Sequence, residues 1–334
     1  MGRFGLSCGV RSFSRSTDNP SPAPAPRSVP PAAAAPRDLP RHEPRELPRS
    51  PGRDFSREPL RDDRPRARAE ERIRETPVCG LAAVQALFKS RADEIKRLFF
   101  DLPTSRRVGG MSGYLAGQKK IYRQVAPEEL EKIAGTIHHG GIVAIIDQPP
   151  PRIPAADDLA RWAKTGKPVV LLDRIGNAHN LGAIVRTLAF FGIENLVVAA
   201  GESAARPGES TYRVAEGGME FVQVWIAADF ARLCAELRAA GFGVVGTAVR
   251  GPELRALNRA EFLPKTVHKR ADSAAQAAKM PIALVLGNEE AGLAPDVAKA
   301  CDRLVHIPGS GQVESLNVSA ATAVLVAALV VGAK

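Results

Sequence analysis

Short apolar runs alternate with helical patterns through the second half of the chain. Helical stretches separate most of these runs, and this alternation favours a mostly parallel β-sheet that is covered on both faces. The sequence therefore predicts an α/β domain over residues 166–334. The runs expected to form its buried strands are 168–172, 195–199, 221–226, 243–249, 282–286 and 304–307.

A second, smaller set of apolar patterns precedes this domain. It predicts a small α/β unit over residues 77–147, followed by a linker over 148–165 that contains three consecutive prolines. The elements expected in the small unit are helices over 78–88 and 128–137 and strands over 95–100 and 141–146.

Residues 1–76 are rich in proline, arginine and alanine and contain no lysine. Such a segment has too little apolar surface to offset the loss of chain entropy on folding, so we expect it to be disordered. Two roles remain open for this arm. It is either a solubilising tail or an arginine-rich segment that adds non-specific contacts to phosphates.

Charge and cysteine content narrow the class of protein. The formal net charge of +10 favours a polyanionic partner, although charge alone does not separate RNA from DNA or a membrane surface. The four cysteines are scattered, without the Cys-x-x-Cys spacing of a metal site. We therefore expect free thiols, a reducing compartment and no metal.

The most apolar stretch is residues 318–333. It is shorter than the roughly 20 residues that cross a bilayer, so we interpret it as a buried helix. With no secretory signal visible at the N-terminus, these patterns predict a cytoplasmic protein without a membrane anchor.

Three segments carry candidate chemistry, and the first is 173–187, DRIGNAHNLGAIVRT. An apolar strand leads into a polar loop, and a helix is expected to begin near Gly182. Asn180 and Arg186 would then lie on either side of the helix start, close enough to converge on one ligand. The alternative for Arg186 is a surface arginine in a salt bridge.

The second segment is 284–293, LVLGNEEAGL, in which an apolar strand ends on Gly287. A residue without a Cβ atom lets the backbone approach a ligand closely. Glu289 follows in the loop. The alternative is a strand-to-helix turn whose acidic residues cap the next helix.

The third segment is 307–321, IPGSGQVESLNVSAA. It joins the end of a strand to a glycine-rich bend, a polar Ser-Leu-Asn step and an apolar helix. The free backbone N–H groups at a helix start can hold a polar ligand. Asn317 could equally be an ordinary N-cap of that helix, and the two roles can coexist.

In this order, across residues 166–332, the three segments resemble the motifs of the SpoU (TrmH-like) RNA 2'-O-ribose methyltransferases of the SPOUT superfamily. No Gly-x-Gly-x-x-Gly follows an expected strand and no Walker A lysine loop is present, so the ordinary dinucleotide-binding and P-loop interpretations lose support. The resemblance implies a catalytic set of Arg186, Asn180, Glu289, Ser315 and Asn317, and contacts to S-adenosyl-L-methionine from Gly287, Ile307 and Leu316.

The resemblance also implies a fold and an assembly. The C-terminal domain would contain a deep trefoil knot, and the small unit would be a substrate-binding domain similar to ribosomal protein L30e. The enzyme would be a homodimer in which both subunits complete each site. Its partner would be rRNA or tRNA.

The implied reaction is methyl transfer from S-adenosyl-L-methionine to a ribose 2'-OH. In family proposals the arginine matched by Arg186 accepts the proton, but a guanidinium with a pKa above about 12 rarely deprotonates. We therefore expect Arg186 to anchor a phosphate and stabilise the developing alkoxide. A histidine such as His179 is expected to be an ordinary loop residue.

Two departures from the family pattern keep an alternative open. Gly309 replaces the usual methionine after Ile-Pro, and Ala215 replaces a serine in the segment 212–218, where Arg213 could bind phosphate or lie on a helix surface. The alternative is an RNA-binding or ribosome-assembly factor that keeps the fold with little or no activity.

Overall fold

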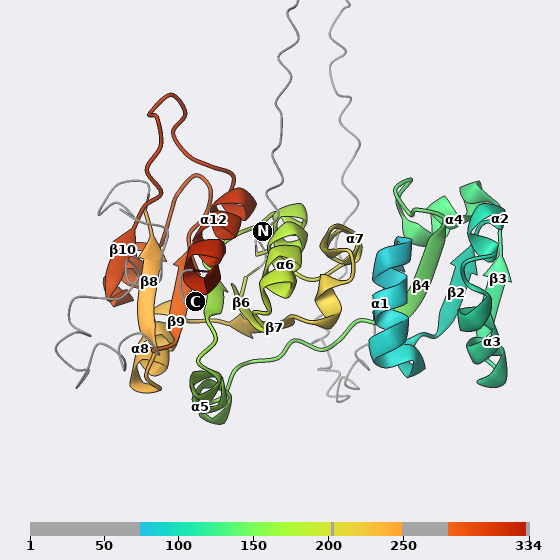
Figure 1. Ribbon diagram of the computed structural model, residues 1–334, viewed down its shortest axis with the longest axis horizontal. Helices are drawn as coiled ribbons and strands as arrows, with labels where there is room; N and C mark the ends of the chain where they lie inside the picture. Colours follow the sequence, from blue (N-terminus) through green and yellow to red (C-terminus); the bar gives the residue numbers. More distant parts are fainter. Residues whose placement is uncertain (1–73, 202–203, 249–279, 332–334) are drawn as a thin grey trace, which may run out of the picture. The chain divides into compact units, whose positions relative to one another are not determined.

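The computed structural model describes residues 74–201, 204–248 and 280–331 (Figure 1). In this part of the chain there are two sheets, one of four strands and one of six. The predicted disordered arm lies outside the described residues except for its last three positions.

The four-stranded sheet belongs to the predicted small unit and has the strand order β1-β4-β2-β3. β4 pairs antiparallel with β1 and β2, and β3 adds in parallel at the edge. The strands are β1 (Glu75–Cys79), β2 (Arg97–Phe100), β3 (Ile121–Gln124) and β4 (Ile142–Asp147), and the helices are α1 (Leu81–Arg91), α2 (Leu102–Ser105), α3 (Gly109–Gly117) and α4 (Pro127–Ala134), with a 3-10 turn η1 (Ala92–Glu94) after α1.

The prediction of a helix over 78–88 was wrong at its start. Val78 and Cys79 belong to β1, and the helix begins at Leu81. Gly80 has a φ of 91°, a conformation that glycine adopts readily, and this turn ends the strand. The strand β3 was missed because all four of its residues are exposed, so it lacks apolar alternation.

The six-stranded sheet has the order β10-β8-β9-β5-β6-β7, and every pairing in it is parallel. This confirms the predicted parallel sheet, with strand ends shifted by one or two residues. Val249, at the end of one predicted run, lies outside the described residues. The strands are β5 (Val169–Leu172), β6 (Asn195–Ala199), β7 (Gln223–Ala227), β8 (Gly243–Thr247), β9 (Ile282–Leu286) and β10 (Arg303–Val305).

Helices cover both faces of this sheet (Figure 1). One core holds apolar residues of α6 and α12, and the other holds those of α5, α8 and α11. All five residues of β9 are buried, as expected for a strand enclosed on both sides. The helices are α5 (Ala156–Thr165), α6 (Ala178–Phe191), α7 (Glu209–Ala215), α8 (Phe230–Ala239), α11 (Pro295–Ala300) and α12 (Val318–Val331), with a 3-10 turn η2 (Gly218–Glu220).

The helix α5 occupies the second half of the segment expected to be a linker. Leu159 and Trp162 of this helix are buried in the core of the large sheet. Asp158 accepts a hydrogen bond from the backbone N–H of Ala155, and Gly166 ends the helix in the left-handed conformation. Only the residues before α5 therefore connect the two sheets.

The helix α12 confirms the interpretation of the apolar stretch as a buried helix. Leu325, Val326 and Leu329 are completely or almost completely buried, and α12 packs against α6. Within the described ranges, no helix is both long and apolar enough to cross a membrane.

Candidate functional site

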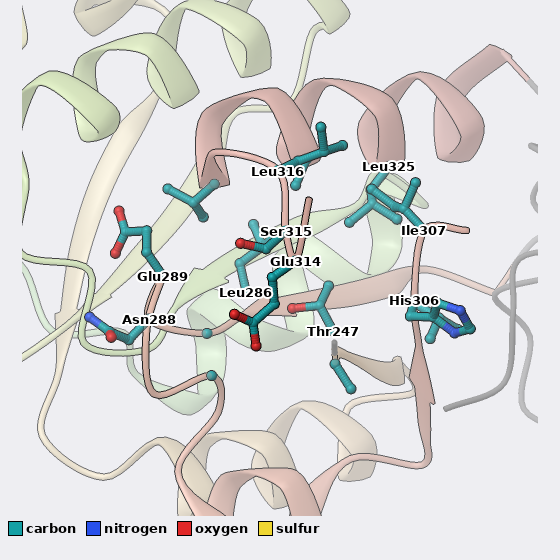
Figure 2. Close-up of a pocket in the computed structure, with 16 residues that line it drawn as sticks. Thr247, Leu286, Asn288, Glu289, His306, Ile307, Glu314, Ser315, Leu316 and Leu325 are labelled. Carbon is teal, nitrogen blue, oxygen red and sulfur yellow. The ribbon is translucent and has the colours of Figure 1, made fainter. Parts of the chain in front are cut away.

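A pocket opens at the carboxyl ends of β8, β9 and β10 (Figure 2). Because parallel strands end at the same edge of a sheet, the loops that follow them meet there. Its empty volume is about 750 Å³, part of it open to solvent. The lining residues are Thr247, Ala248, Leu286, Gly287, Asn288, Glu289, Gly292, Val305, His306, Ile307, Glu314, Ser315, Leu316, Val318, Ala321 and Leu325.

The first predicted segment enters the site through the N-terminus of α6. Asn177 is the N-cap, and its side chain accepts hydrogen bonds from the backbone N–H groups of His179 and Asn180. The helix therefore begins at Ala178, about one turn before the predicted start near Gly182. Asn180 and His179 are first-turn residues of the helix, so the interpretation of His179 as a loop residue was wrong.

A chain of hydrogen bonds joins one residue from each of the three predicted segments. Asn180 Nδ2 donates to Glu289 Oε1 at 2.6 Å, and Asn317 Nδ2 donates to Asn180 Oδ1 at 3.2 Å. Each of these two bonds joins residues more than 100 positions apart in the chain, so only the fold brings them together. The three segments therefore converge on one place, beside the pocket.

Arg186 does not join this group within one chain. It follows Asn180 by six positions in the same helix, which places it about 240° further around the helix axis. The expectation that Asn180 and Arg186 converge on one ligand depended on a later helix start, and within one chain it was wrong. Arg186 instead pairs with Glu216 at 2.9 Å, and both side chains are more than half exposed. Such a pair contributes at most about 1 kcal/mol, so Arg186 is free to take another partner.

Gly287 lines the pocket, but a glycine is required there by contacts within the protein, not by a ligand. A Cβ atom there would lie 2.4 Å from both the carbonyl carbon of Gly292 and the backbone nitrogen of Leu293. Asn288 and Gly292 exchange two backbone hydrogen bonds that close this loop. The close approach required at Gly287 is therefore between two parts of the same loop.

Side chains of the first and second segments hold this loop in place. Asp173 Oδ2 accepts from the backbone N–H of Ala294 at 2.7 Å, and Asn288 Nδ2 donates to the carbonyl oxygen of Arg174 at 3.0 Å. The Arg174 guanidinium donates to the carbonyl oxygen of Gly292. The alternative in which the acids of this loop cap the next helix is wrong, because α11 begins after Ala294 without a side-chain cap.

The third segment supplies the other wall of the pocket, through Ile307, Ser315 and Leu316. Asn317 accepts a hydrogen bond from the backbone N–H of Ser319 at 2.9 Å, in the manner of an N-cap, while its amide donates to Asn180. The two roles considered for Asn317 therefore coexist in one side chain.

The pocket residues that were missed in the sequence include three with polar side chains outside the assigned site, Thr247, His306 and Glu314. Figure 2 shows the Glu314 carboxylate pointing into the pocket, toward the space between Asn288 and Thr247. Glu314 directly precedes the Ser-Leu-Asn step, and this position could have indicated that Glu314 belongs to the site. The direction of a side chain in an irregular loop, however, does not follow from periodicity.

Neither of the two positions that depart from the family pattern, Gly309 and Ala215, lines the described pocket. Gly309 is exposed and does not line the pocket, and a Cβ atom added to it would meet no other atom within 4 Å. Ala215 is buried, at 1% exposure. Arg213 pairs with Glu209 at 2.9 Å and lies 3.3 Å from the His179 ring, so it lies beside the start of α6.

The cysteines of the described residues, Cys79, Cys234 and Cys301, are free thiols. Burial raises the pKa of the Cys79 thiol to about 12, with a further contribution from Glu209, so this sulfur stays protonated at neutral pH. In the described ranges, no three His, Cys, Asp or Glu residues are grouped as a metal site.

Two family models match the chain. Residues 167–327 match a model described as the SpoU rRNA Methylase family. Residues 77–152 match a model described as RNA 2'-O ribose methyltransferase substrate binding. Together they cover both sheets.

Curated relatives of the chain are also named as methyltransferases of rRNA or tRNA. An uncharacterized tRNA/rRNA methyltransferase of Haemophilus influenzae is 34% identical over 181 residues, which are 54% of this chain and 50% of the relative. The chain thus spans half the length of that protein. The 23S rRNA (guanosine-2'-O-)-methyltransferase RlmB of Ralstonia nicotianae is 32% identical over 248 residues, 73% of this chain and 91% of the relative.

Solved structures share the fold. An AdoMet-bound rRNA methyltransferase from Sinorhizobium meliloti aligns with a TM-score of 0.56 at 23% identity, covering 77% of this chain and 87% of that chain. AdoMet is S-adenosyl-L-methionine. The α/β architecture with its parallel sheet is therefore that of known methyltransferases.

Proposed function

This chain belongs to the SpoU rRNA methylase family, and we propose on that basis that it methylates the 2'-OH of a ribose in structured rRNA or tRNA. The proposed activity is that of an S-adenosyl-L-methionine-dependent RNA 2'-O-ribose methyltransferase. The observation that carries this proposal is the hydrogen-bonded chain Asn317–Asn180–Glu289 beside the pocket.

The pocket has a lining suited to the methyl donor. Leu286, Ile307, Leu316 and Leu325 offer apolar contacts to a flat base, and the carboxylate of Glu314 lies on the same pocket. Clefts with an apolar lining and a few polar groups are typical of cofactor sites. We propose that Gly287, Ile307 and Leu316 contact the cofactor, and that Gly287 acts through the loop shape it permits.

S-adenosyl-L-methionine supplies an electrophilic methyl group on a sulfonium. Asn180, Glu289, Ser315 and Asn317 fix the target ribose beside the pocket, and such alignment removes much of the entropy cost of the reaction. Glu289, which accepts a hydrogen bond from Asn180, is the carboxylate of this group and would take the proton of the ribose hydroxyl. Arg186 anchors an RNA phosphate and stabilises the charge that develops on the 2'-oxygen.

Arg186 reaches a reaction centre if a second copy covers the outer face of α6. Phe190, one turn after Arg186, is 83% exposed. On the neighbouring helix α12, the residues left exposed or partly exposed include Ala320, Ala323 and Val324, and none is charged. A helix that is apolar all round is normally buried on all sides. We propose a homodimer through this face, with Arg186 of one subunit serving the pocket of the other.

Replacing Phe190 with aspartate should therefore convert the dimer to a monomer and abolish methyl transfer. A charge in the centre of an apolar interface carries a large desolvation cost. Analytical ultracentrifugation measures the change in mass. The control is Ile153→Asp, which changes an isoleucine of 76% exposure in another segment and should leave the dimer intact. A Phe190→Asp variant that remains a dimer contradicts the proposed face.

The strand order supports the proposed trefoil knot. β10 pairs with β8 on the side opposite to β9, and α12 then returns to lie against α6. The chain therefore passes β8 to reach β10 at the edge of the sheet, and it returns toward the centre of the sheet to form α12. We propose that this crossing is threaded, which is rare among proteins.

The small unit is proposed to be the L30e-like domain that holds the RNA. It matches a substrate-binding model, and Arg106 and Arg107 are exposed beside its loops without a described acidic partner. A domain of this kind before the catalytic domain favours rRNA over tRNA, and the compartment would be the cytoplasm. The arginine-rich arm over residues 1–76 would add phosphate contacts.

Two measurements test the activity. Isothermal titration calorimetry should show one S-adenosyl-L-methionine bound per subunit. Mapping 2'-O-methyl groups in RNA from cells with and without this gene should reveal a site that depends on the gene. Absence of both results would support the alternative, an RNA-binding or ribosome-assembly factor that keeps the fold.

A further inference from the structure

The acidic lining of the cofactor pocket is unexpected in so basic a chain. The chain carries a formal charge of +10, yet no lysine or arginine lines the pocket in the part that the structure describes. Its charged lining consists of two carboxylates, Glu289 and Glu314, with His306 as the other titratable group. The pocket therefore favours a cation, although the net charge of the chain favours a polyanionic partner.

The two carboxylates are in different situations. Glu289 accepts a hydrogen bond from Asn180 at 2.6 Å. Glu314 has no hydrogen bond or ion pair within the described ranges, and its carboxylate points into the pocket (Figure 2). Glu314 is therefore the acidic group that is available to a ligand.

The proposed reaction changes the charge of the ligand in this pocket. S-adenosyl-L-methionine carries a sulfonium, an ammonium and a carboxylate, and has a net charge of +1. When the methyl group moves, the carbon–sulfur bond breaks, its electron pair stays on sulfur, and a carbon–oxygen bond forms at the ribose, which loses its proton. The product, S-adenosyl-L-homocysteine, is a thioether with a net charge of zero.

We propose that Glu314 makes the pocket selective for the cationic methyl donor over its neutral product, by placing a carboxylate beside the sulfonium. This inference rests on the proposed function and assigns a residue to the choice between the two ligands. Before transfer, the carboxylate attracts the sulfonium. After transfer that attraction is gone, and product release is favoured. Opposite charges about 4 Å apart in a water-exposed site change affinity on the order of fivefold.

The test is Glu314→Gln, which removes the charge and keeps the size and hydrogen-bonding capacity of the side chain. Calorimetric titration with S-adenosyl-L-methionine and with S-adenosyl-L-homocysteine gives two affinities for each variant. The expected result is a donor-to-product affinity ratio that falls about fivefold, with product affinity changed by less than about twofold. The control is Glu290→Gln, an exposed carboxylate that does not line the pocket, for which the ratio should stay constant.

The two affinities distinguish the roles that Glu314 can have. If Glu314 binds the ligand's ammonium or its ribose hydroxyls, both affinities fall in parallel because donor and product share those groups, and the proposal is overturned. An unchanged pair of affinities also overturns it. Failure of the unaltered protein to bind either ligand refutes the proposed function itself, which separates the two outcomes.

Discussion

Replacing Arg186 with alanine is expected to lower the rate of methyl transfer by about a hundred- to a thousandfold, the cost of removing one group that stabilises a developing oxyanion. Binding of S-adenosyl-L-methionine should be unchanged, because Arg186 is proposed to contact the RNA phosphate and the 2'-oxygen, not the cofactor. Stability should be nearly unchanged as well, since an exposed ion pair contributes little. Single-turnover methylation of substrate RNA and calorimetric titration of the cofactor measure the two effects.

The matched control is Arg232→Ala. Arg232 is also an exposed helical arginine in an ion pair, with Glu236 at 2.8 Å, but it lies on α8, on the other face of the sheet. Its replacement should leave the rate within about twofold of the original. Undiminished turnover in Arg186→Ala would refute the catalytic role of this residue and leave only its surface pair with Glu216.

Replacing Gly287 with alanine should both destabilise the domain and prevent cofactor binding. The added methyl group would lie 2.4 Å from two backbone atoms of the loop, and backbone cannot move aside as the end of a flexible side chain can. Overpacking of this kind typically costs about 1–3 kcal/mol. The loop that carries Asn288 and Glu289 would shift, and both residues line the pocket.

Urea unfolding and calorimetry measure these two effects. Gly309→Ala is the control, because this glycine lies near the same pocket and a methyl group there meets no atom within 4 Å. Its stability should change by no more than about 0.5 kcal/mol, and cofactor affinity should be retained. Equal stability of the two variants would show that the loop tolerates a side chain at Gly287.

The strands of the large domain could be located from the sequence because a parallel sheet buried on both faces leaves continuous apolar runs. β6 and β9 were predicted to the residue. The strand β3 could not be located in this way, because all four of its residues are exposed and no buried position marks it in the sequence. The helix α5, of which only Leu159 and Trp162 are buried, was hidden within a segment that contains three consecutive prolines.

The candidate site divides in the same way. The three segments, their polar residues and the family could be identified from the sequence, because each segment is a short motif of consecutive residues. The join between Asn180, Glu289 and Asn317, and the position of Glu314 in the pocket, depend on contacts between residues far apart in the chain. Asn177 caps α6 and so makes the helix begin about one turn earlier than predicted. This earlier start places Asn180 and Arg186 on different sides of the same helix. The sequence alone identifies the types of the site residues. The distances between these residues and the directions of their side chains are set only in the folded chain, because the parallel sheet brings the loops that follow its strands to one edge.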